Sequence, residues 1–150
     1  MGVLYDYFHA PGIAEVRRHL DQNEGESPVP DTFEGVFVKQ IDPTVLLGQL
    51  VGFAGGRTWA PDLVQEKLVW PEDAEDSEGP WVTVLDDNTR DVLAAITAER
   101  MPELAGRWAA VEEFGGHLDA TLLGETIEEL AALAGRARAQ GESLYCWICL

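Results

Sequence analysis

The residues with the most evident chemical potential are two cysteines in the segment Cys146-Trp147-Ile148-Cys149. A C-x-x-C pair supports redox chemistry at a helix N-terminus, where the thiol pKa is lowered, and it binds zinc when two further ligands lie nearby. Residues 144–150 are apolar throughout, however, and predict a strand. Side chains three apart in a strand point to opposite faces, so the two thiols cannot bind one ion together. We therefore expect buried core thiols and no cofactor, with a zinc or redox role as the weaker alternative.

The remaining nucleophiles and bases match no catalytic motif. The three histidines lack the H-E-x-x-H spacing, and the sequence contains neither a G-x-S-x-G elbow nor a phosphate-binding glycine loop. An alternative is a small-molecule-binding protein or enzyme with a pocket between the sheet and the helix that starts at Asp42. Asp6, His9, Asp42 and His117 would then supply its polar groups.

An acidic loop between two tryptophans is the second notable feature. It contains five acids within seven positions: Glu72, Asp73, Glu75, Asp76 and Glu78.

The spacing of these acids is not that of an EF-hand, which argues against a calcium site. The loop is then either simply solvated or a contact patch for a basic partner, because dense carboxylates accelerate association with a cationic surface. Trp70 and Trp81 flank the loop, and we expect them to anchor its ends in the core. The alternative is that they form an exposed binding hot spot.

Composition limits the classes of partner. The chain has 150 residues, a usual size for one domain, and 46% of them are hydrophobic, which argues against disorder. Ten Lys and Arg stand against 27 Asp and Glu, a formal net charge of -17. Such a field repels nucleic acid and anionic lipid, so neither is expected as a partner. No apolar run approaches the roughly 20 residues of a membrane span, and the basic region of a signal peptide is absent, so we expect a cytoplasmic protein with free thiols.

The order of elements predicts the architecture. Segments rich in β-branched and aromatic residues predict four strands, at 2–9, 33–38, 81–85 and 144–150. Apolar stripes and capping residues predict helices at 13–20, 42–53, 61–68, 86–96, 102–111 and 120–140. This order indicates a single α+β domain over residues 1–150, with a small four-stranded sheet packed on one side by several helices. The last strand is apolar on both faces, so we expect it to be central or covered on both sides.

The chain opens with Met1-Gly2 followed by Tyr5-x-Tyr7-Phe8, has Ile41-Asp42 before an apolar helix, and closes with a late helix that ends at Gly141 before an apolar strand. In this pattern, which spans most of the chain, it resembles the YfbM-like family of bacterial proteins of unknown function. The resemblance implies a compact α+β fold and no established activity. The family typically carries an aromatic residue and a histidine in the helix after the aspartate, whereas residues 43–50 here contain neither. A function tied to that histidine would not carry over.

Charge and the missing catalytic motifs together favour a non-enzymatic protein-interaction module. Small acidic domains of this kind include immunity-type inhibitors that bind a basic partner. The acidic loop 72–78 with Trp70 and Trp81 is the predicted contact surface.

Overall fold

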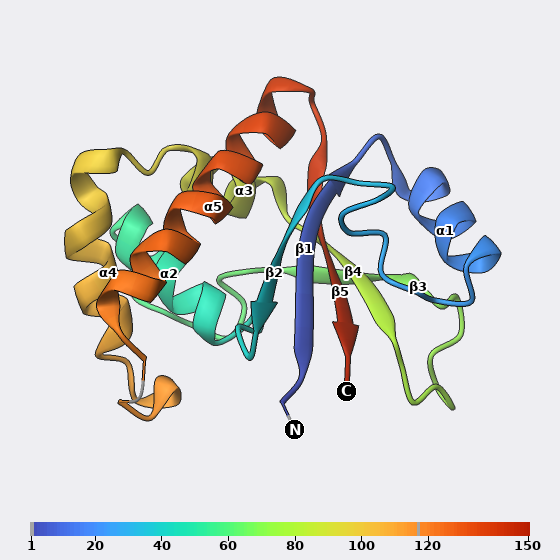
Figure 1. Cartoon of the computed structure of the whole chain (residues 1–150), viewed down its shortest axis with the longest axis horizontal. Coiled ribbons are helices and arrows are strands. Elements are labelled where there is room, and N and C mark those ends of the chain that lie inside the picture. Colours follow the sequence, from blue (N-terminus) through green and yellow to red (C-terminus); the bar gives the residue numbers. More distant parts are fainter. Residues whose placement is uncertain (1, 117) are drawn as a thin grey trace.

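A five-stranded antiparallel sheet forms the centre of the molecule. The computed structural model describes residues 2–116 and 118–150. The strand order is β2-β1-β5-β4-β3, so the last strand of the chain lies in the middle (Figure 1). The strands are β1 (Leu4–Ala10), β2 (Gly35–Lys39), β3 (Glu66–Trp70), β4 (Trp81–Leu85) and β5 (Ser143–Cys149).

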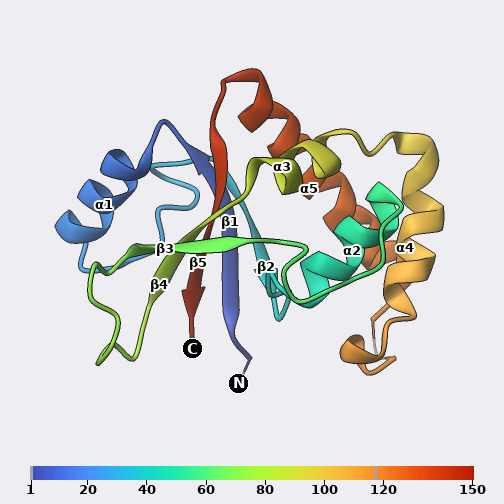
Figure 2. The same ribbon diagram turned by 180° about the vertical axis from the view of Figure 1, so that it is seen from behind.

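Helices cover both faces of this sheet. They are α1 (Ile13–Gln22), α2 (Leu46–Gly55), α3 (Asp87–Ala94), α4 (Met101–Ala109) and α5 (Ala120–Ala139), with 3-10 turns η1 (Ala98–Arg100) and η2 (Glu112–Phe114). Helices α2, α3, α4 and α5 lie on one side of the sheet, and α1 lies on the other (Figures 1 and 2). The predicted α+β class is therefore confirmed. The prediction that helices pack on only one side of the sheet is wrong.

The prediction of four strands is also wrong, because residues 66–70 form strand β3. We expected a helix there from Leu63, Val64 and Leu68. Leu63 and Val64 are indeed buried, but they belong to the turn before the strand, and Leu68 is 40% exposed. The strand forms because residues 66–70 pair with β4, a contact that no local pattern indicates.

Side chains of β5 alternate between two hydrophobic clusters. Leu144 and Cys146 belong to the larger cluster, beneath the helices α2 to α5. Tyr145 and Trp147 belong to the smaller one, with residues of α1 and the following loop. The predicted alternation and the central, buried strand are thus confirmed. The strand ends one residue earlier than expected, at Cys149, and Leu150 is 75% exposed.

Local capping chemistry defines the helix starts that the sequence predicted best. The carboxylate of Asp86 accepts the N–H of Thr89, and that of Asp119 accepts the N–H of Thr121. The carboxylate of Asp42 likewise accepts two backbone N–H groups, from Val45 and Leu46. The helix itself begins later than Asp42, at Leu46, because residues 43–45 form a turn.

Two glycines of α2 allow the following loop to lie directly against the helix. A Cβ at Gly48 would come within 2.8 Å of Trp59 Nε1, and a Cβ at Gly52 within 2.8 Å of the Arg57 backbone oxygen. The loop is held there by two hydrogen bonds, from Trp59 Nε1 to the Thr44 oxygen (2.9 Å) and from the Arg57 N–H to the Gly52 oxygen (2.9 Å).

We expect Gly52→Ala to destabilise the protein by about 1–3 kcal/mol, because the added methyl group clashes with backbone that cannot rotate away. Gly135→Ala is the matched control, since a Cβ there meets nothing within 4 Å in the interior of α5. This control should instead stabilise the protein, by up to about 1 kcal/mol through helix propensity. Urea unfolding of both variants measures the difference, and equal effects would contradict the close loop–helix contact.

Candidate functional site

The acidic loop displays its carboxylates to solvent. All five acids, from Glu72 to Glu78, are exposed, whereas the flanking Trp70 and Trp81 are half-buried. Trp70 packs against the smaller cluster, and its Nε1 donates a hydrogen bond to Asp21 Oδ1 at 2.9 Å. Both indole rings therefore lie at the ends of the loop, and the acids between them point outward.

The three described residues of the alternative pocket, Asp6, His9 and Asp42, each contact different partners. Asp6 and His9 lie three residues apart in β1. Because side chains alternate along a strand, they project from opposite faces. Asp6 accepts a hydrogen bond from Ser27 Oγ at 2.6 Å, and Asp42 caps the turn before α2. His117 lies outside the described residues. Each described member of the set is thus engaged in its own local structure.

His9 instead forms part of a partly buried polar network that sequence reasoning missed. Its Nδ1 lies 2.6 Å from Glu142 Oε1, and the residue is only 7% exposed. Arg90 donates to the backbone oxygen of Glu142 at 3.0 Å and pairs with Asp91 at 3.0 Å. The network ties α3 to β1 and to the turn before β5, so it contributes to packing of the elements. No spacing in the sequence signals a contact between residues 133 positions apart.

Asp6 is a buried carboxyl whose one side-chain partner among the described residues is Ser27. Burial raises its pKa above the ordinary value, and the hydrogen bond from Ser27 opposes this rise only in part. The folded state consequently holds the proton of Asp6 more tightly than the unfolded state does. Ionisation of Asp6 therefore costs stability at neutral pH.

We expect Asp6→Asn to raise the midpoint of thermal unfolding at pH 7, because the amide keeps an acceptor for Ser27 and carries no charge. The advantage should shrink as the pH falls toward the unfolded-state pKa, about 3.9, since Asp6 of the parent protein then becomes protonated too. Asp31→Asn at an exposed position is the control and should change little. A variant that is less stable than the parent at pH 7 would contradict this account.

The two cysteines occupy opposite sides of the sheet. Cys146 is fully buried in the larger cluster, whereas Cys149 is half-buried against the smaller one. Burial raises the pKa of the Cys146 thiol well above its usual value, the charge of Glu66 adds to this, and a hydrogen bond with Tyr7 lowers it. Within residues 2–116 and 118–150, no group of three or more His, Cys, Asp or Glu is arranged to hold a metal ion.

Alkylation of the native protein at pH 8 should therefore modify Cys149 first, with Cys146 at least about tenfold slower, because only the accessible thiolate reacts. Peptide mapping by mass spectrometry after timed iodoacetamide treatment measures both rates. In denaturant the two rates should become similar. Fast labelling of Cys146 in the folded protein would contradict its burial.

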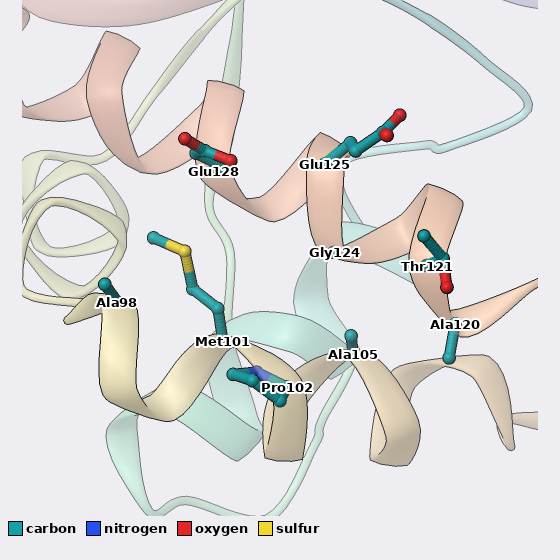
Figure 3. Close-up of a pocket in the computed structure, with 9 residues that line it drawn as sticks. All are labelled: Ala98, Met101, Pro102, Ala105, Ala120, Thr121, Gly124, Glu125 and Glu128. Atoms are coloured by element: carbon teal, nitrogen blue, oxygen red, sulfur yellow. The ribbon is translucent and has the colours of Figure 1, made fainter.

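A groove with an apolar floor lies between α4 and α5. It has a volume of about 560 Å³. Met101, Pro102 and Ala105 contribute from α4, and Gly124 lies opposite on α5 (Figure 3). Figure 3 shows Met101 projecting toward α5, with Glu128 above it. The other lining residues are Ala98, Ala120, Thr121 and Glu125.

Small side chains create this groove. A Cβ at Gly124 would lie 3.7 Å from the Cβ of Ala105, so the two helices approach closely at this point. The larger apolar residues of both helices, such as Leu104 and Ile127, turn inward to the core. On the outer side, Met101 is the large side chain that lines the groove, and the positions around it are small residues such as Ala98, Ala105 and Gly124, so the space between the helices stays open. Each helix alone looks ordinary in sequence, so only their contact reveals the groove.

Carboxylates on the exposed face of α5 border the groove. Glu125 and Glu128 line it, and with Glu129 they also line a second hollow of about 500 Å³ on the other side of α5. In the described part of the chain, none of these three carboxylates lies within 4 Å of a cationic group. The groove thus combines an apolar floor with unneutralised negative charge.

Comparisons with known proteins return no match: no family model, no curated protein and no solved structure is similar to this chain. Among the described residues, no helix has the length and apolar character needed to cross a bilayer.

Proposed function

We propose that the protein is a non-enzymatic interaction module that binds a basic partner through the α4–α5 groove. The observation that carries the proposal is the apolar floor around Met101 and Ala105 beside the carboxylates of Glu125 and Glu128. Apolar contact supplies affinity in a concave site, and charge selects the partner. In this proposal the groove is the main contact, and the role of Trp70, Trp81 and the acidic loop as a contact surface stays a prediction.

A cationic amphipathic helix is the occupant that this surface fits best. Its apolar side chains would fill the groove over Ala105 and Gly124, and its Lys or Arg side chains would reach the carboxylates on α5. The two helices that form the groove run side by side (Figure 1), which suits an elongated segment. The formal net charge of -17 favours such a partner over an anionic one.

The acidic loop 72–78 has a different part in this proposal. Its exposed carboxylates strengthen the negative field and accelerate encounter, while the apolar contact is made in the α4–α5 groove. Immunity-type inhibition of a basic toxin is one form that such binding takes. The proposal also includes a cytoplasmic location, supported by two free thiols. Membership of the YfbM-like family stays a prediction.

The test uses a fluorescent amphipathic peptide with Lys and Leu at helical spacing, titrated at low and at physiological salt. We expect Glu125→Lys combined with Glu128→Lys to weaken binding at least about tenfold, because attraction becomes repulsion beside the groove. Glu72→Lys combined with Glu75→Lys is the matched control, since it changes the net charge equally on the acidic loop.

Fluorescence anisotropy measures the dissociation constants. A peptide with Ser in place of Leu should bind much more weakly, because it has no apolar side chains to bury on the floor of the groove. Equal losses in the two double variants would show non-specific attraction to an acidic protein and would overturn the proposed site.

A further inference from the structure

Another hollow, distinct from the two beside α5, has two arginines, Arg57 and Arg107, among its lining residues. It has a volume of about 630 Å³ and sits between the outer side of α2, the loop that follows α2, and Arg107 of α4. Its lining includes Gln49, Phe53, Thr58 and Trp59. It shares no lining residue with the α4–α5 groove.

Two cationic side chains in one hollow are unexpected in this chain, which has only ten Lys and Arg in total. Helix capping does not account for them. The C-terminal carbonyls of α2 are already satisfied by Arg100, which donates to the Ala54 oxygen at 2.8 Å and to the Phe53 oxygen at 3.4 Å. Arg100 therefore already stabilises the negative end of the α2 dipole, so neither Arg57 nor Arg107 is needed for this role.

The guanidinium donors of both arginines remain available. Arg57 is exposed, and its side chain has no hydrogen bond or ion pair within the described residues. Arg107 stacks over the ring of Phe53, 4.4 Å from the centroid, which leaves its in-plane N–H groups free to donate. Its one ion pair among the residues that the structure describes, with Glu103, is long (3.9 Å) and half-exposed, and such a pair contributes little.

The walls of the hollow are fixed rather than loose. Trp59 is anchored by its hydrogen bond to the Thr44 oxygen, and the loop lies on α2 at Gly48 and Gly52, where no side chain intervenes. The Arg107 guanidinium is oriented by Phe53. A ligand would thus meet a fixed Trp59 and one oriented guanidinium, that of Arg107, which lowers the entropy cost of binding, whereas the exposed Arg57 side chain would become ordered on binding.

We propose that this hollow binds a small organic anion with a planar apolar part. Arg57 and Arg107 bind its phosphate or carboxylate group, since guanidinium groups match such oxygens in bidentate geometry. Trp59 offers an aromatic surface to its planar part. The volume falls within the range of small-molecule pockets, about 300–1,000 Å³. This site is separate from the proposed partner groove, so either can fail without the other.

Isothermal titration of the full chain with phenyl phosphate tests the proposal, with inorganic phosphate and phenol as comparison ligands. We expect saturable binding of phenyl phosphate and weaker binding of either fragment. Arg57→Gln and Arg107→Gln should each weaken binding about tenfold or more, because each substitution removes a charged hydrogen-bond donor. The affinity of Arg57→Lys should lie between those of the parent protein and Arg57→Gln, because lysine keeps the charge but lacks the two parallel N–H donors of a guanidinium.

Arg138→Gln is the matched control, because it removes one exposed cation from the end of α5, away from the hollow. It should bind like the parent protein. Thermal unfolding shows that each variant is folded, and the Trp59 indole N–H signal in NMR spectra reports where the ligand sits. Absence of saturable binding at millimolar phenyl phosphate, or equal binding by the Arg57→Gln and Arg138→Gln variants, would overturn the proposal. If inorganic phosphate bound as tightly as phenyl phosphate, the proposed contact between Trp59 and a planar group of the ligand would be overturned.

Discussion

The position of β5 is the constraint on which the rest of the structure depends. This strand pairs with β1 on one edge and β4 on the other, and its side chains are apolar on both faces. A sheet built around such a strand must be covered on both sides, because either exposed face would leave large apolar residues in water. Helix α1 and its loop cover Trp147, while α2 to α5 cover Cys146. The C-x-x-C pair is consequently part of the fold, with one thiol in each half of the core.

The same constraint decides which polar groups remain for function. Several polar groups are engaged in structure. His9 contacts Glu142, Asp42 caps the turn before α2, and Arg100 binds the carbonyls at the end of α2. Surface groups outside these networks are then the ones available to ligands. Two of the places where they lie have opposite character: carboxylates flank the apolar α4–α5 groove, and arginines lie beside aromatic rings next to α2.

Prediction from sequence succeeded where the deciding interaction is local. Asp86 and Asp119 cap helices through residues two or three positions away, and the alternation of β5 follows from strand geometry alone. It failed at β3, where pairing with β4 overrides the helix-like spacing of apolar residues. The exposed acids of the loop were evident, whereas both hollows depend on contacts between separate elements. Small residues such as Ala105 and Gly124 give no signal until two helices meet.

The central claim is that a basic partner binds between α4 and α5. Chemical-shift mapping tests it most directly, with isotope-labelled protein titrated with the cationic amphipathic peptide. The account predicts that the largest shift changes lie in residues 98–105 and 120–128, around the groove. Changes confined to the loop 72–78, or spread evenly over all acidic surfaces, would contradict it.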